Sequence, residues 1–249
     1  LDDHEALVEV ASECELAVNF IGIIRASADN SYYQAHEMTA QAIVRAAEAA
    51  TMKGMISLSI AGADSDSRNS CLRSRSEADQ IFLHSSVPAT LIRLPMVLGE
   101  RDAASQALLK KAASVIHFSF RAGSLEQPIY AGDVITALDR LLNQPIQSRV
   151  LDLGGPECLP RHQLIRLAGS FLEVKPIIQT LPLFLGLLVA GLLQHLMSSP
   201  PVTRTMLELL DQDDVIDNSD ALHYLNIELT PLADMLAYLA EDFRQLQYS

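Results

Sequence analysis

The sequence predicts an α/β protein built on a parallel sheet. Short apolar runs alternate with stretches of helical periodicity, so we expect strands at 17–24, 55–60 and 89–94 with helices at 34–52 and 71–84 between them. Strand, helix and strand at this spacing are typical of right-handed βαβ units. At 249 residues and 49% hydrophobic content, the chain can bury one large core with an appended smaller part.

Each element has a local reason. The run 17–24 is brief, almost entirely apolar and rich in branched residues, as in a buried strand. The helix at 34–52 is rich in alanine, repeats apolar residues at helical spacing and ends at Lys53-Gly54. We expect His36, near its start, to be a surface or capping residue. The strand at 89–94 ends at Pro95.

The second half of the chain becomes progressively helical. The further expected elements are a helix at 104–115, a short strand at 128–131, a helix at 133–142 and a strand at 150–153. Asp133 is expected to be the N-cap of its helix. From Leu159 onward the pattern is helical with no convincing strand. Two parts are predicted, a sheet-bearing part at 1–158 and a helical part at 159–249.

Composition excludes several classes of partner. A net charge of −13 without a basic stripe argues against nucleic acid. The three cysteines and seven histidines show no metal-ligand spacing, so no metal site is expected. Sparse cysteines suit a reducing compartment, and no signal peptide is visible. The expected location is therefore the cytoplasm or an organelle matrix, with a position peripheral to a membrane as a variant.

The run Leu183 to Leu193 is uninterrupted and apolar. Eleven helical residues extend roughly 16 Å, far less than a bilayer core of about 30 Å. We expect a helix that is buried or covered by a partner. A helix lying on a membrane surface is the alternative, and a membrane span is the least favoured reading.

Six segments, in order, resemble the atypical extended short-chain dehydrogenase/reductases, which are NAD(P)-dependent epimerase/dehydratase-like proteins. They are 18–22, 55–62, 70–79, 93–99, 127–134 and 153–157. The tail segments 200–216 and 225–231 are similar to the nucleotide-binding accessory subunit of respiratory complex I and its bacterial relatives. The resemblance covers nearly the whole chain and implies a Rossmann-like fold with a C-terminal helical part.

The resemblance also implies where a dinucleotide site lies. Active relatives carry a Tyr that exchanges a proton with the substrate and, four residues on, a Lys that holds the nicotinamide ribose. Cys71 and Arg75 stand at those two positions, and Ser59 matches the family serine that faces the nicotinamide. We expect Cys71 to be structural or vestigial, with a redox or nucleophilic role as the alternative. The implied cofactor-binding residues are Ile21, Gly22, Ser59, Arg75, Pro95 and Val97.

The family's Gly-rich phosphate turn does not precede residue 17. By comparison with the family, the sheet is expected to lack its N-terminal strands, so binding of NADP or NAD is conditional on a missing N-terminal segment. A fragment, a trimmed chain or a complementary second chain each account for this.

Two functions follow from the resemblance. The favoured one is an NAD(P)-binding protein, catalytically weak or silent, that serves as a structural or regulatory subunit linked to respiratory complex I or quinone metabolism. Its partner would be a respiratory complex or a membrane surface, contacted through the helix at 183–193. The alternative is an active NAD(P)H-dependent reductase or sugar-nucleotide epimerase-like enzyme, which the replacement of the Tyr and Lys by Cys71 and Arg75 disfavours.

Overall fold

The computed structural model describes residues 3–27, 29–196, 204–209 and 212–247. Its centre is a four-stranded parallel sheet in the order β1-β2-β3-β8. The strands are β1 (Leu16–Asn19), β2 (Gly54–Ile60), β3 (Ala89–Leu94) and β8 (Arg149–Asp152). In register, Asn19 lies beside Ser57, Ser59 beside Arg93, and Arg93 beside Asp152. The predicted α/β class with a parallel sheet is confirmed.

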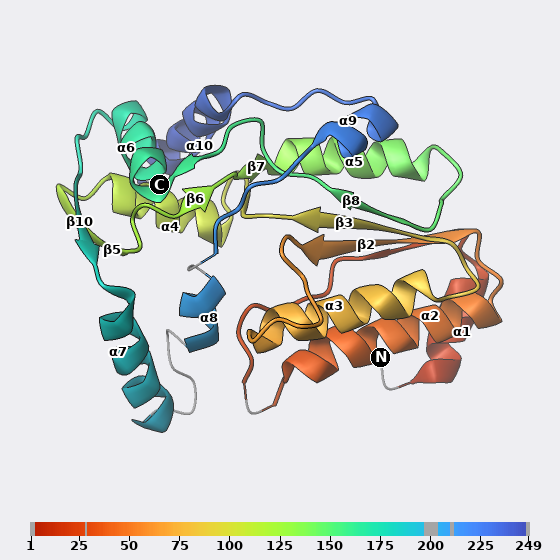
Figure 1. Ribbon diagram of the computed structural model, residues 1–249. Coiled ribbons are helices and arrows are strands. Elements are labelled where there is room, and N and C mark those ends of the chain that lie inside the picture. The colour runs from red at the N-terminus through yellow and green to blue at the C-terminus, as the bar shows by residue number, and fades with distance from the viewer. Residues whose placement is uncertain (1–2, 28, 197–203, 210–211, 248–249) are drawn as a thin grey trace.

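Helices cover both faces of this sheet (Figure 1). One face carries α1 (His4–Ser12), the π-helix η1 (Tyr33–Met38), α2 (Thr39–Ala49) and α3 (Ser70–Leu83), and the other carries α5 (Ala131–Leu142) and α9 (Ser219–Leu225). Because both faces are covered, the central strands are apolar on both sides. Met55, Ile56, Leu91 and Ile92 are accordingly fully buried.

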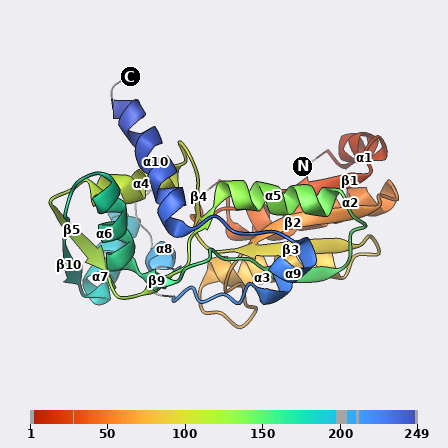
Figure 2. The same cartoon turned by 90° about the horizontal axis from the view of Figure 1, so that it is seen from above.

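A second packed unit lies at one end of the sheet (Figure 2). It consists of α4 (Ala103–Ala112), α6 (Arg161–Phe171), α10 (Leu232–Gln247) and the parallel pair β5 (Ile116–Phe120) and β10 (Ile177–Leu181). Leu109, Leu164, Leu236 and Leu239 are at most 1% exposed in its core. The strand pair β4 (Val97–Leu98) and β7 (Ile129–Tyr130) connects this unit to the sheet.

The expectation of no strand after Leu159 is wrong. β9 (Leu159–Pro160) pairs antiparallel with β6 (Leu125–Glu126), and β10 pairs with β5. These strands are short and their partners lie far earlier in the chain, so no local periodicity marks them.

The division at residue 158 stays a prediction, because the packed units draw on both sides of it. Ala221 and Leu225 of α9 join the core of the sheet. Leu109 of α4, from the earlier half, packs with Leu236 of α10.

The apolar run forms α7 (Leu183–Leu196), followed by α8 (Arg204–Leu209). A Cβ on Gly186 would lie 2.9 Å from the Phe120 ring, so α7 packs closely on β5. Phe184 and Leu188, in contrast, are 60% and 63% exposed. Among the described helices, none has both the length and the apolar composition needed to cross a bilayer.

The turn after β8 provides a test of this packing. A Cβ on Gly155 would lie 1.9 Å from the carbonyl oxygen of Pro128, whereas a Cβ on Gly123 would meet nothing within 4 Å. Gly155→Ala should therefore lower the free energy of unfolding by about 2–3 kcal/mol, because backbone must move. Gly123→Ala should change it by less than about 0.5 kcal/mol. Urea unfolding measures both, and equal midpoints for the two variants would contradict the packing described.

Candidate functional site

A hollow of about 210 Å³ lies where β1, β2 and β3 end at their carboxyl edge. This edge is where open parallel sheets bind ligands. The hollow is lined by Gly22, Ile23, Ile24, His36, Ser59, Ile60, Cys71, Arg75, Leu94, Pro95 and Val97. Of the residues that the sequence predicted for the site, the structure brings six together here and places Ile21 next to them.

The strand β1 is shorter than the predicted 17–24. Asn19 ends it, because its side-chain amide donates to Ser57 Oγ at 3.0 Å and its Oδ1 accepts from the Ile21 N–H at 3.0 Å. After Asn19 the chain turns away from β2. Ile21 and Ile23 therefore do not pair with that strand, and they line hollows. The apolar composition of 20–24 thus serves the site, which periodicity alone does not distinguish from a strand.

Helix α3 positions the two residues at the family's catalytic places. Asn69 caps the helix: its Oδ1 accepts from the N–H groups of Cys71 at 3.0 Å and Leu72 at 3.3 Å. Cys71 and Arg75 follow one turn apart and both line the hollow.

Arg75 is 8% exposed and binds the ends of two strands. One guanidinium nitrogen donates to the carbonyl of Ile21 at 2.8 Å, and the other donates to the carbonyl of Leu58. Both carbonyls lie beyond the last residue pair between β1 and β2, which is Asn19 with Ser57. The guanidinium therefore fills the place where the two strands separate.

A buried carboxylate balances this cation. Asp79, one turn further along α3, is 1% exposed and accepts from Arg93 Nε at 3.1 Å. Burial raises the pKa of Asp79, and the charges of Arg93 and Arg75 oppose that rise. A buried ion cluster of this kind is costly to break by removing one member.

Cys71 is a buried thiol. It is 1% exposed, and its Sγ donates to the carbonyl of Ile23 at 3.4 Å. Burial raises the pKa of the Cys71 thiol to about 11, and the nearby Arg75 offsets this only in part. The thiolate needed for nucleophilic attack is therefore scarce near neutral pH.

His36 was expected to be a surface or capping residue, and this expectation is wrong. It is 3% exposed, and its Nε2 lies 3.1 Å from both the N–H and the carbonyl oxygen of Ile23. Burial, and then Arg75, lowers the pKa of His36 to about 4, so the imidazole is neutral at pH 7. The sequence was interpreted as a continuous α-helix, whereas η1 winds as a π-helix and changes which residues face inward.

Tyr32 contacts His36, one of the residues that line the hollow, and the sequence did not single it out. Its ring centroid lies 5.8 Å from that of His36, and its hydroxyl donates to the carbonyl of Ile24 at 3.1 Å. Burial raises the pKa of Tyr32. The pKa values of Tyr32 and Cys71 are raised and that of His36 is lowered, so all three move away from the neutral range in which a general acid or base works well.

Asp133 is not the N-cap that was expected. α5 begins at Ala131, and the carboxylate of Asp133 accepts from the N–H of Thr230 at 2.9 Å and its hydroxyl at 2.7 Å. It joins α5 to the segment that leads into α10, because a partner 97 residues away is available in the fold.

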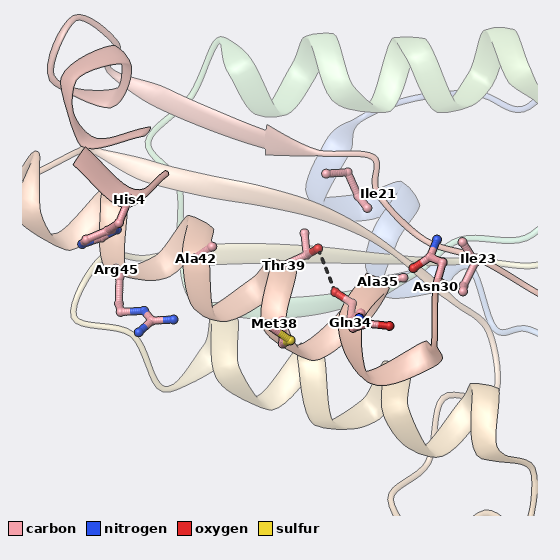
Figure 3. A pocket seen from close by; sticks show the side chains of 10 residues that line it. All are labelled: His4, Ile21, Ile23, Asn30, Gln34, Ala35, Met38, Thr39, Ala42 and Arg45. Carbon is pink, nitrogen blue, oxygen red and sulfur yellow. Dashed lines mark hydrogen bonds between the residues drawn. The ribbon is translucent and has the colours of Figure 1, made fainter. Parts of the chain in front are cut away.

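A larger hollow of about 630 Å³ lies beside β1 and along α2 (Figure 3). Its described lining includes His4, Asn30, Gln34 and Arg45, and Ile23 lines both hollows. The buried ion cluster and the two family positions are found at the smaller hollow. We therefore take the smaller hollow as the candidate site.

Comparisons with known proteins give the same fold. No protein-family model matches the chain. The UDP-glucuronic acid 4-epimerase of Bacillus cereus, solved with NAD, superposes with a TM-score of 0.70 at 15% identity, over 96% of this chain and 78% of that one. RMD of Pseudomonas aeruginosa, solved with NADPH, gives 0.72 at 11% identity, over 98% and 85%. The chain thus has the Rossmann-like fold of the extended short-chain dehydrogenase/reductases, as the motifs predicted.

A curated relative agrees with the predicted subgroup. The mitochondrial NADH dehydrogenase (ubiquinone) 1 alpha subcomplex subunit 9 of Arabidopsis thaliana is 21% identical over 241 residues. The match covers 92% of this chain and 60% of that protein. The chain therefore spans about three fifths of the length of this relative.

The neutral state of His36 should make stability depend on pH. The native state lowers the imidazole pKa from 6.5 to about 4, so the unfolded chain binds more protons between these values. The contribution of the neutral imidazole to the free energy of unfolding is complete above pH 6.5 and is lost as pH falls towards 4. It amounts to about 2 kcal/mol after allowance for solvent screening. His36→Gln should remove it, so the difference in urea midpoint between the two proteins should change with pH; a constant difference would disprove it.

Burial should also decide which cysteine reacts. Cys71 is buried with a raised pKa, whereas Cys14 is exposed. In native protein with iodoacetamide at pH 8, we expect Cys14 to be alkylated at least tenfold faster than Cys71, as read by peptide mass spectrometry. Unfolding in urea is the control and should equalise the rates. Comparable rates in the native protein would refute the buried-thiol description.

Proposed function

We propose that this chain binds the nicotinamide half of NADP or NAD without transferring hydride, and acts as a structural or regulatory subunit of a respiratory assembly. The observation that carries this proposal is the state of Cys71 and Arg75. The thiol is protonated and turned to the carbonyl of Ile23, and the guanidinium is bound to the carbonyls of Ile21 and Leu58. The fold is present, but the proton-transferring pair of the active relatives is replaced by groups that hold the strands together.

The hollow suits part of a dinucleotide. Gly22 leaves room for close approach, which a side chain would not, because a Cβ there would crowd the Arg75 guanidinium with its nearest nitrogen 3.1 Å away. Arg75 stays charged and retains further N–H groups for ribose hydroxyls. Ser59, Pro95 and Val97 would border the nicotinamide. The residues of this chain would bind and orient the nicotinamide and exclude water from it.

The pyrophosphate requires further groups. No Gly-rich turn occurs before β1 within this sequence, and such a turn ordinarily binds the phosphates through helix amides. The proposal is therefore limited to the nicotinamide half of the dinucleotide.

Membership in an assembly is supported by the similarity to the Arabidopsis subunit and by α7. This helix presents Phe184 and Leu188 away from the protein. We propose that α7 contacts a respiratory-complex partner or a membrane surface, where exposed apolar side chains are covered.

Binding can be tested on the chain as it stands with reduced nicotinamide mononucleotide, which is the half of the cofactor that the hollow would take. We expect saturable binding by calorimetry. Gly22→Val, which fills the hollow, should weaken it at least tenfold, whereas Gly123→Val, placed in open space, should leave it unchanged. Folding of both variants is checked by circular dichroism. Absence of binding to the unmodified chain, or equal binding to both variants, would defeat the proposal.

Catalysis is tested separately with NADPH and a panel of aldehydes, ketones and UDP-sugars. We expect rates at background, because no proton donor with a pKa near neutral faces the hollow among Cys71, Tyr32 and His36. Substantial hydride transfer by the unmodified protein would instead support the active reductase or epimerase-like alternative.

A further inference from the structure

A third hollow of about 520 Å³ lies at the packed unit beside the sheet. Its described lining is Ile24, Met96, Ala104, Ala107, Leu108, Lys111, His117, Phe118, Ser119, Phe120, Glu126, Arg161, Ile165, Met206 and Leu207. The lining comes mainly from α4, β5, α6 and α8. Ile24 also lines the candidate nicotinamide site, so the two hollows are adjacent.

The walls of this hollow are mostly aliphatic and aromatic. Leu108, Ile165 and Leu207 are buried and form a closed side, whereas Phe118 is 59% exposed. The ring of Phe120 packs against α7 at Gly186. A large apolar side chain left exposed at the edge of a hollow favours an apolar ligand that would cover it.

One of the two cations at this hollow, Lys111, has no hydrogen-bonded partner among the described residues. Burial lowers the pKa of Lys111, and the nearby carboxylate of Glu126 opposes this fall. Arg161 Nε donates to Glu126, and an Arg161 guanidinium nitrogen donates to the carbonyl of Phe120 at 2.9 Å, so these two charges compensate each other. The ammonium of Lys111 forms no hydrogen bond or ion pair with any residue that the structure describes. Burial, and then Lys111, lowers the pKa of His117, which is therefore neutral at pH 7. Among its lining residues the hollow thus has two cations, Lys111 and Arg161, and one carboxylate, Glu126, in a chain of net charge −13.

We propose that this hollow binds a monoanionic amphiphile of the fatty-acid type. Its carboxylate would pair with Lys111, and His117 would supply a neutral hydrogen-bonding group beside it. Its aliphatic chain would lie against Phe118, Phe120 and Leu108. This inference is independent of dinucleotide binding, because it uses other residues and a different ligand.

The charge balance disfavours a nucleoside diphosphate here. Two phosphate groups call for more than one free cation, since phosphate sites commonly combine several charged donors. The carboxylate of Glu126 is also part of the lining and would repel a second negative charge. A single carboxylate matches a single ammonium, and the large apolar wall matches a hydrocarbon chain.

Calorimetry with octanoate, decanoate and dodecanoate, each below its micellar concentration, tests the proposal. We expect one saturable site whose affinity rises about tenfold for every two methylene groups. Lys111→Met keeps the length of the side chain and removes its charge, and should weaken dodecanoate binding at least tenfold. Lys110→Met is the matched control on the neighbouring exposed residue of α4 and should bind as the unmodified chain does.

Three results would overturn the inference. The first is absence of saturable binding of the fatty acids. The second is equal affinity of dodecanoate for the Lys111 and Lys110 variants. The third is that UDP-glucuronate binds more tightly than dodecanoate and that the Lys111 variant no longer binds UDP-glucuronate. Dodecyltrimethylammonium is the control for detergent-like binding and should bind at least tenfold more weakly than dodecanoate. Because nicotinamide mononucleotide is titrated separately, failure of either site is distinguished from failure of the other.

Discussion

The buried guanidinium of Arg75 is the contact on which the candidate site depends. It bonds the carbonyls of Ile21 and Leu58, where β1 and β2 separate. Without a donor there, two carbonyls would face a low-dielectric interior unpaired, at a cost of about 1–3 kcal/mol each. The cation in turn contributes to the lowered pKa of His36 and opposes the raised pKa of Cys71. One side chain therefore controls both the backbone and the charge state around the hollow.

Much of the fold could be predicted from the sequence, because βαβ spacing is a local signal. The strand at 89–94 was predicted with its observed ends, and α3 was displaced by a single residue. The partners of β9 and β10 and the bond from Asp133 to Thr230 depend on contacts between distant segments. Periodicity carries no information about such contacts, and these are the features that were missed.

The residues of the candidate site likewise divide into those that sequence motifs predicted and those that depend on the fold. The motif positions converge on one hollow because the carboxyl ends of parallel strands share an edge. His36 and Tyr32 belong to no motif that was recognised, and the helix that carries them is not a regular α-helix. The only sequence signal for His36 was a polar ring in an otherwise alanine-rich stretch, which a surface position explains equally well. Whether the motif positions bind a nicotinamide stays a prediction.

The π-helix η1 has a consequence for how the sequence can change. A π-turn holds one residue more than an α-turn, and each residue of an α-helix advances by about 100°. Deleting one residue within Tyr33–Met38 would let the segment wind as a regular α-helix continuous with α2, and would swing the His36 imidazole away from the backbone of Ile23. The loop 20–27 would lose that anchor while the helix itself became more regular. Length variation in this segment therefore affects the site far more than the helix that contains it.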